Sequence, residues 1–256
     1  MENIVKIRNI KLGEGIPKIC IPVIEKNEKD IIKYIKEINK LPADIIEWRA
    51  DFYINDISKY DNNFDDIAAF SKEIQKTSNK PVIFTLRSLK EGGNIKYNIY
   101  GDIMSLYNII IESRCFELID LELFSFKEND IKNLIKLSNF NNIKTIISNH
   151  DFSKTPSKKE IISRIKKMIK LKCDISKTAY MPKNRKDVIT LLDASSEIKN
   201  FPVIAISMGE IGAITRIFGS VLTFASAKRS SAPGQIETMK LKYILDSIYT
   251  KNKIHL

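Results

Sequence analysis

Cysteine and histidine are scarce in this 256-residue sequence, which contains three of the first and two of the second. Cys20, Cys115 and Cys173 are odd in number, form no Cys-x-x-Cys pair and lie in or beside apolar runs. This usage argues against a disulfide framework and predicts reduced, buried thiols. His255 stands in a charged C-terminal tail, so His150 is the one histidine candidate for the interior. No group of His, Cys and carboxylate residues has metal-ligand spacing, and we expect no metal site.

Long apolar runs and low-complexity segments are also missing. Nine glycines and eight prolines are too few for collagen-like or disordered sequence. The longest uncharged stretch covers residues 217–227 and is too short to cross a bilayer. The first 15 residues carry scattered charges and lack the apolar core of a secretory signal. Together with the reduced cysteines, these features predict a cytoplasmic protein.

The chain is basic, with 42 Lys and Arg against 31 Asp and Glu and a net charge of +11. A basic balance is compatible with a nucleic acid, an anionic surface or a small anionic substrate as partner. The excess is mostly lysine, because only eight residues are arginine, and the lysines are spread along helical segments. We therefore interpret the charge as a compositional bias toward Ile, Lys and Asn, and we expect no nucleic-acid and no membrane partner.

Eight short apolar runs rich in β-branched residues recur along the chain. They are almost continuously hydrophobic, which is typical of strands covered on both faces. The runs are 19–24, 44–48, 82–86, 116–121, 143–148, 173–176, 203–207 and 220–225.

Segments with helical periodicity separate these runs, as in 158–171, where apolar residues form one face and lysines the other. Eight strands alternating with helices in about 250 residues predict a single (β/α)₈ barrel domain over 1–256. Residues 1–16 are expected to form an N-terminal hairpin, with a strand over 5–10 and a glycine turn, that closes one barrel end. The alternative is a doubly wound open sheet, but no Gly-x-Gly-x-x-Gly follows the first strand.

Polar side chains cluster where the predicted strands end, which in a barrel is the face that carries the chemistry. Lys177 follows the sixth run among apolar neighbours, and a lysine amine that has lost its proton can attack a carbonyl to form a Schiff base. His150 follows the fifth run, and an imidazole suits proton transfer near neutral pH. Taken alone, Lys177 could instead reach solvent at the rim, and His150 could be a hydrogen-bonded core residue.

Three of the eight arginines, Arg49, Arg87 and Arg216, are predicted near the same rim. Guanidinium groups suit a carboxylate or a phosphate. No glycine-rich phosphate loop accompanies the last two predicted strands, so a small carboxylate-bearing substrate is favoured.

At these positions the chain resembles the type I 3-dehydroquinate dehydratase (3-dehydroquinase) family of the shikimate pathway. The resemblance extends from residue 18 to residue 240. It lies in EWRADF at 47–52, FTLRSLKEGG at 84–93, SNHDF at 148–152, ISKTAYMP at 175–182, ISMGEIGAITR at 206–216, FGSVLTFASAK at 218–228 and SAPGQI at 231–236.

The resemblance implies a (β/α)₈ lyase that dehydrates 3-dehydroquinate to 3-dehydroshikimate by syn elimination, as a homodimer without metal or organic cofactor. Carried over by motif, Lys177 is the Schiff-base lysine, His150 the general acid and base, and Glu91 the carboxylate that orients it. The implied substrate-binding residues are Glu47, Arg49 and Arg87 for the ring hydroxyls, and Arg216, Ser231 and Gln235 for the carboxylate and a nearby hydroxyl.

Two departures from the family pattern stand out. Pro22 occupies a position where the family often has serine, and the chain is about four residues shorter between Arg216 and Phe218. Three other functions are kept as alternatives, namely a Schiff-base aldolase, a binder of nucleic acid or an anionic surface that only the net charge suggests, and a barrel that has lost its activity. The aldolase would cleave C–C bonds and often grip phosphate, whereas an inactive barrel would not need to retain both Lys177 and His150.

Overall fold

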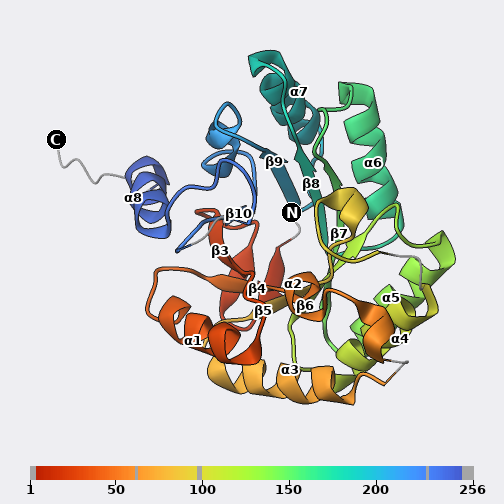
Figure 1. Ribbon diagram of the computed structural model, residues 1–256. Coiled ribbons are helices and arrows are strands. Elements are labelled where there is room, and N and C mark those ends of the chain that lie inside the picture. The colour runs from red at the N-terminus through yellow and green to blue at the C-terminus, as the bar shows by residue number, and fades with distance from the viewer. Residues whose placement is uncertain (1–3, 61–62, 97–99, 229–230, 250–256) are drawn as a thin grey trace.

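The computed structural model describes residues 4–60, 63–96, 100–228 and 231–249 (Figure 1). The first three residues of the expected hairpin and His255 lie outside this part of the chain. Within the described ranges, no helix is both long enough and apolar enough to span a membrane.

Eight parallel strands form the central sheet, one for each predicted run. They are β3 (Lys18–Val23), β4 (Ile45–Arg49), β5 (Val82–Thr85), β6 (Leu118–Glu122), β7 (Lys144–Asp151), β8 (Ile175–Tyr180), β9 (Val203–Ser207) and β10 (Leu222–Phe224). Their spatial order is β10-β3-β4-β5-β6-β7-β8-β9, so β3 to β9 follow one another in sequence order and β10 pairs with β3. This sequential order confirms the barrel and excludes the doubly wound sheet, in which the strand order reverses.

The first and last strands of this order, β10 and β9, meet through a short polar seam. The amide of Val221 donates to the carbonyl of Val203 at 3.1 Å. The Ser220 hydroxyl accepts from the amide of Ala205 at 2.9 Å and lies 3.1 Å from the Ala205 carbonyl. A serine side chain thus takes the place of a backbone partner and nearly closes the barrel.

Helices surround the sheet on its outer side (Figure 1). They are α1 (Glu28–Ile38), the short α2 (Ala50–Ile54), α3 (Asp65–Thr77), α4 (Tyr100–Ser113), α5 (Glu128–Phe140), α6 (Lys158–Lys170), α7 (Arg185–Ser196) and α8 (Thr238–Tyr249). In α6 the buried residues are Ile161, Ile165 and Met168, as its periodicity predicts, and the Ser157 side chain caps its first turn.

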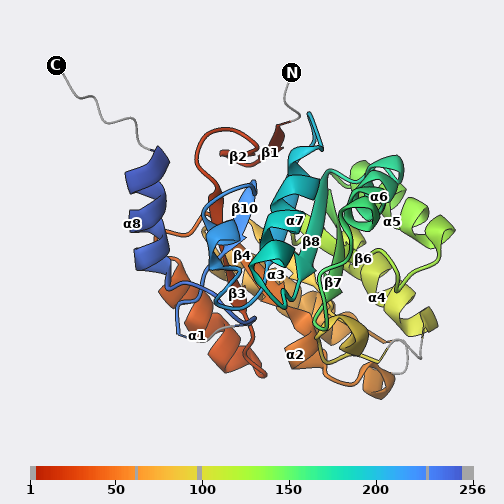
Figure 2. The ribbon, with the colours of Figure 1, turned by 90° about the horizontal axis from the view of Figure 1, so that it is seen from above.

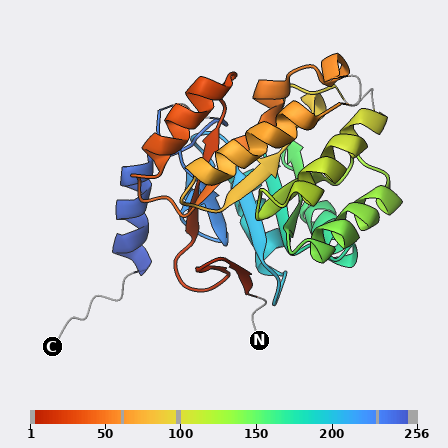
Figure 3. The ribbon, with the colours of Figure 1, turned by 90° about the horizontal axis from the view of Figure 1, so that it is seen from below.

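The N-terminal hairpin consists of β1 (Val5–Ile7) and β2 (Ile10–Leu12), which pair in antiparallel fashion. It lies at one end of the barrel, opposite α2 (Figures 2 and 3). Val5, Ile7 and Leu12 pack against the lowest layer of side chains inside the barrel. The predicted closure of this end is therefore confirmed.

The predicted glycine turn of the hairpin is wrong. The chain turns at Arg8, whose φ of 50° is in the left-handed region, and Gly13 and Gly15 come only after the second strand. The Arg8 guanidinium donates to Glu117 at 2.7 Å, and this contact holds a non-glycine residue at the turn. The local sequence pointed to the glycines because it cannot show that Arg8 meets Glu117, which is 109 positions further along the chain.

Side chains inside the barrel form an apolar layer below a polar one. The lower layer consists of Cys20, Ile45, Ile83, Leu118, Ile146, Ile175, Ile204 and Leu222. Two residues further along five of these strands stand Glu47, Thr85, Asp120, Ser148 and Lys177, all buried. Because successive residues alternate between the faces of a strand, these polar groups also point inward.

Lys177 lies within β8 and not after it, which corrects the predicted strand boundary. The residues from Thr178 to Tyr180 still pair with both β7 and β9. The polar residue did not end the strand, because β4 and β6 supply it with carboxylate partners inside the barrel.

Candidate active site

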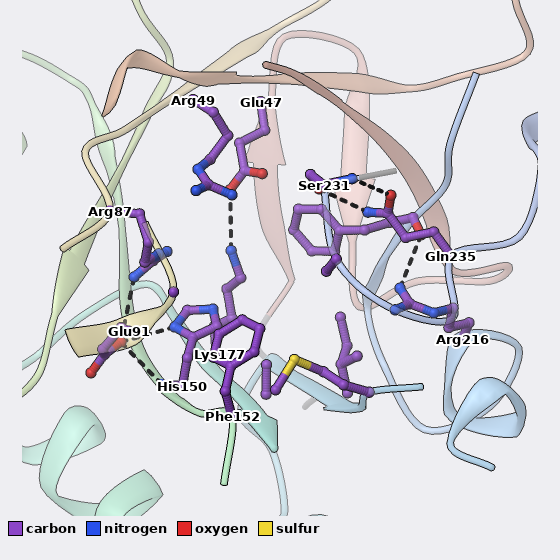
Figure 4. Close-up of a pocket in the computed structure, with 16 residues that line it drawn as sticks. Glu47, Arg49, Arg87, Glu91, His150, Phe152, Lys177, Arg216, Ser231 and Gln235 are labelled. Atoms are coloured by element: carbon purple, nitrogen blue, oxygen red, sulfur yellow. Dashed lines mark hydrogen bonds and ion pairs between the residues drawn. The ribbon is translucent and has the colours of Figure 1, made fainter. Parts of the chain in front are cut away.

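One pocket collects all nine residues that the sequence singled out. It opens at the carboxyl ends of the strands and comprises about 510 Å³, part of which is open to solvent. Its walls include Glu47, Arg49, Arg87, Glu91, His150, Lys177, Arg216, Ser231 and Gln235. In Figure 4, Lys177 stands between the His150 and Glu91 pair on one side and Arg216 with Gln235 on the other. The shortened segment before Phe218 has therefore not displaced Arg216 from the pocket.

Lys177 is only 4% exposed, and its side chain lies in contact with two carboxylates. Its Nζ is 3.1 Å from Asp120 Oδ2 and 3.2 Å from Glu47 Oε1, and it stands 4.5 Å from the centroid of the Phe224 ring. The sequence led us to expect apolar neighbours, so this ion-paired environment is a correction. A buried amine needs such partners to offset its desolvation, and it must give up a proton before it can attack a carbonyl.

His150 and Glu91 form a hydrogen-bonded pair at the rim. His150 Nδ1 lies 2.9 Å from Glu91 Oε2, and the same oxygen accepts the His150 backbone N–H at 3.0 Å. Glu91 ends the short 3₁₀ turn Leu89–Glu91, and Gly92 follows with a φ of +81°. A Cβ at Gly92 would lie 2.2 Å from the Phe152 ring and would force that ring to move. Together with the positive φ, this favours glycine in the turn that presents Glu91 to His150.

The surroundings push the pKa values of the pair in opposite directions. Burial, together with the charge of Glu122, raises the pKa of Glu91 to about 8. Burial, together with the cations Arg87 and Lys177, lowers the pKa of His150 well below its usual range. His150 is therefore a neutral imidazole near pH 7, as a general base must be.

Arg87 connects the carboxylates of the pocket. It is 3% exposed and lies 2.9 Å from Asp120, 3.2 Å from Glu122 and 3.5 Å from Glu91. Although burial raises the pKa of Asp120, the larger combined effect of Arg87 and Lys177 holds it below its usual range. The positive charge of the guanidinium thus offsets the repulsion between these closely spaced carboxylates.

Arg49 reaches the pocket from the end of β4 and is fixed by a bidentate ion pair. Its Nε and Nη2 donate to the two oxygens of Asp51 at 2.7 and 2.9 Å, and its guanidinium carbon lies 5.0 Å from the Phe52 ring centroid. Asn94 also donates to Asp51 at 3.1 Å. The pair fixes where Arg49 can meet a ligand.

Arg216 is 1% exposed, yet among the described residues its hydrogen-bond partners are backbone carbonyls alone. Its Nη1 donates to the carbonyl of Phe224 at 3.1 Å and its Nη2 to that of Pro233 at 2.9 Å, while Nε has no partner. Over the ranges that the structure describes, no ion pair joins Arg216 to a carboxylate. Burial lowers its pKa to about 10, which still leaves it charged at neutral pH. A buried cation without an anion marks where an anionic ligand group would bind.

Ser231 and Gln235 form a small hydrogen-bonded loop beside Arg216. The Ser231 amide donates to Gln235 Oε1 at 2.9 Å, and Gln235 Nε2 donates to Ser231 Oγ at 3.0 Å. The close approach of Gly234 to the Gly209 backbone, where a Cβ would meet the carbonyl oxygen at 2.2 Å, holds this loop against the barrel. The two side chains therefore line the wall that contains Arg216.

Sequence reasoning did not select several residues that build the site. Asp120 lies near the end of the predicted run 116–121, but its ion pair with Lys177 appears only when β6 and β8 are placed in one barrel. Phe224 and Asp51 lie within the motifs given above. Nothing in the sequence shows that Phe224 contacts Lys177 or that Asp51 pairs with Arg49. Across the described residues, no group of three His, Cys, Asp or Glu side chains could hold a metal ion.

Known proteins of one family match this chain over nearly its whole length. The family model for type I 3-dehydroquinase matches residues 19–252. The 3-dehydroquinate dehydratase of Listeria monocytogenes serotype 4b (strain F2365) is 39% identical, and the match covers 96% of this chain and 98% of the relative. That of Clostridium kluyveri (strain ATCC 8527) is 42% identical, with 97% and 98% covered.

Solved structures give the same result. A type I 3-dehydroquinate dehydratase from Clostridium difficile, solved with covalently modified comenic acid, has a TM-score of 0.88 and 40% identity. It covers 98% of this chain and 99% of its own. The 3-dehydroquinate dehydratase of Geobacillus kaustophilus has a TM-score of 0.89 and 31% identity, covering 99% and 100%.

Proposed function

The chain belongs to the type I 3-dehydroquinase family, and on that premise we propose that it dehydrates 3-dehydroquinate to 3-dehydroshikimate through an imine on Lys177. The observation that carries the mechanism is the position of the buried Lys177 amine, with a neutral histidine on one side and an unpaired arginine on the other. A ketone held between them by an attached carboxylate would present its carbonyl to the amine.

Imine formation is the first step. The Lys177 ammonium passes a proton to a neighbouring carboxylate, for which Glu47 at 3.2 Å is in contact. The free amine adds to the substrate ketone, and the carbinolamine loses water to give a protonated imine. This cation withdraws electrons from the adjacent carbon and makes its C–H bond acidic.

Elimination follows, with His150 as both base and acid. The neutral imidazole removes the proton next to the imine, and the resulting enamine expels the β-hydroxyl group. The imidazolium returns its proton to the departing oxygen, so one water is lost and the histidine is restored. One side chain can serve both groups only when they lie on the same ring face, and the elimination is therefore syn. Hydrolysis of the imine releases the product and the amine.

The remaining polar groups bind and orient the substrate. Arg216 holds the substrate carboxylate, with Ser231 and Gln235 on the carboxylate and a nearby hydroxyl. The ring hydroxyls lie toward Glu47, Arg49 and Arg87 on the opposite wall. Pro22 provides no side-chain donor at the end of β3. Orientation of this kind can contribute about 7–11 kcal/mol in well-aligned reactions.

Replacing Arg216 with methionine should raise KM roughly 10–100-fold, because a hydrogen bond to a charged group contributes about 1.5–3 kcal/mol. The same change should not destabilise the free enzyme strongly, because it removes a buried cation that has no anion. Steady-state kinetics and thermal unfolding measure the two effects. Arg185→Met, which removes an equal charge from the exposed start of α7, is the matched control.

A substrate analogue with an amide in place of the carboxylate tests the pairing directly. It should bind the native enzyme more weakly than the parent acid, and it should show little difference between native enzyme and Arg216→Met. An unchanged KM in the variant would remove Arg216 from carboxylate binding.

Ultraviolet absorbance on mixing with 3-dehydroquinate tests the reaction itself. The product contains a conjugated enone that absorbs, whereas the substrate does not, so the absorbance should rise with time. Sugar-phosphate ketones, which an aldolase would cleave, should give no reaction. A folded enzyme that leaves 3-dehydroquinate unchanged would favour the inactive barrel instead.

A further inference from the structure

We propose that Arg164 on α6, acting through Asn149 and Glu91, fixes the tautomer of His150 and so sets the pH above which it can act as a base. This inference rests on the proposed role of His150. Arg164 and Asn149 do not line the pocket, and they act as positioning residues that touch neither the substrate nor its reacting atoms.

A chain of three hydrogen bonds joins α6 to the pocket. Arg164 Nη1 donates to Asn149 Oδ1 at 2.7 Å, and Asn149 Nδ2 donates to Glu91 Oε1 at 3.0 Å. Glu91 Oε2 then meets His150 Nδ1 at 2.9 Å. The hydroxyl of Tyr180 also reaches Asn149 Oδ1, at 3.1 Å.

The direction of this chain is decided at Arg164. A guanidinium has donors and no acceptor, so the group facing it must be the carbonyl oxygen of the Asn149 amide. Tyr180 cannot make this choice, because its hydroxyl can donate or accept, and burial raises its pKa to about 12 and keeps it protonated. With the oxygen held by Arg164, the Asn149 amide can present only N–H groups to Glu91.

The N–H group that Asn149 donates influences whether Glu91 is protonated. Oε1 accepts from Asn149 and Oε2 accepts from the His150 backbone, so the carboxylate form is the one that both contacts favour. A Glu91 carboxylate requires His150 to donate through Nδ1, which leaves Nε2 free as the base. A protonated Glu91 would instead donate to Nδ1, place the ring proton on Nε2 and disable the base.

The groups around Glu91 favour its acid form and its carboxylate form in opposing ways, so the loss of one contact can shift the equilibrium between the two forms. Arg87 faces it at 3.5 Å and favours the carboxylate, whereas burial and Glu122 on β6 favour the acid and raise its pKa to about 8. Tyr180 on β8 faces it as a neutral hydroxyl. His150 on β7 is held neutral by burial and by Arg87, Lys177 and Arg49. The hydrogen bond from Asn149 is therefore one of the few contacts that lower the pKa of Glu91 against the effect of burial.

Arg164 is itself firmly held. It pairs with Glu160 one turn earlier on α6, and its guanidinium carbon lies 5.4 Å from the Phe124 ring centroid and 5.8 Å from that of Tyr180. Its side chain is 17% exposed, which is low for an arginine on an outer helix. These contacts hold it at the position from which Nη1 reaches Asn149.

Arg164→Met should move the acid limb of the kcat/KM profile upward by about one pH unit, because Glu91 loses the oriented donor. Activity should fall about 10-fold below the shifted limb and recover nearly to the native value above it. In the resting enzyme, ¹⁵N-histidine NMR at a pH just above the Glu91 pKa of about 8 should show the His150 proton moving from Nδ1 toward Nε2. The chain has only two histidines, so the spectrum is simple to assign.

Lys167→Gln is the matched control. Lys167 is also on α6 and also lies over the Phe124 ring, at 5.7 Å, but no contact joins it to Asn149 in the described structure. Its loss removes a similar charge and should leave both profile and tautomer unchanged. Asn149→Asp provides a second variant that retains the acceptor for Arg164 and Tyr180 while offering Glu91 no amide donor. Asn149→Asp should move the acid limb of the kcat/KM profile upward, and by more than Arg164→Met does.

Native-like profiles and tautomers in both Arg164→Met and Asn149→Asp would overturn the inference. An equal shift in Lys167→Gln would also overturn it, because the cause would then be helix charge and not the orientation of Asn149. Since NMR reads the resting enzyme without substrate, a confirmed tautomer change in a protein that does not dehydrate 3-dehydroquinate would contradict only the proposed function.

Discussion

Replacing Lys177 with methionine should lower kcat by at least about 10⁴-fold, because the reaction loses its covalent electron sink. The variant should still fold. Asp120 retains Arg87 at 2.9 Å and Ser148 at 2.5 Å, and Glu47 retains Thr85 at 3.0 Å. Its thermal stability should fall, since a buried cation is removed from two carboxylates. Ultraviolet kinetics and a thermal melt measure the two effects separately.

Borohydride trapping identifies the lysine directly. Reduction of the native enzyme with substrate present should convert the imine to a secondary amine and add a stable mass to one peptide. Trypsin does not cleave after an alkylated lysine, so the label should appear on the uncut peptide covering residues 173–183. Lys177→Met should take up no label, whereas Lys183→Met, which changes an exposed lysine nearby, should be labelled normally. Labelling at another lysine would contradict the mechanism.

Replacing His150 with alanine should leave imine formation intact and lower turnover by about 10²–10⁴-fold, the usual range for losing a general acid or base. We expect the upper end, because the same imidazole removes one proton and delivers another. The imine should survive because Lys177 retains its own partners, Glu47 and Asp120. Borohydride should therefore still label the variant, while the absorbance of the enone rises very slowly.

Added imidazole provides the control for His150→Ala. The deleted ring leaves a space at the pocket wall beside Glu91, and free imidazole entering it should restore part of the activity. Rescue would distinguish a missing base from a disturbed fold. Near-normal turnover in the variant, on the other hand, would remove His150 from the proposed mechanism.

The sequence by itself determined the architecture and the charged residues that line the pocket. Eight buried apolar runs separated by helical segments, with no Gly-x-Gly-x-x-Gly after the first run, favour the barrel over the doubly wound sheet, and the structure places one strand at each run. The pocket residues were also accessible from sequence. Motifs at the strand ends name Lys177, His150 and Arg216, and the carboxyl ends of parallel barrel strands converge on one face.

Only the tertiary structure decided which groups are paired and which are not. The strand pattern cannot show that Lys177 contacts Asp120, or that Arg216 is buried without an anion. It also cannot show that Arg164 orients Asn149 toward Glu91. These relations join residues up to 130 positions apart in the chain, as for Lys177 and Glu47. Periodicity determines which side of a strand or helix is buried, whereas distances and charges between side chains exist only once the strands lie side by side.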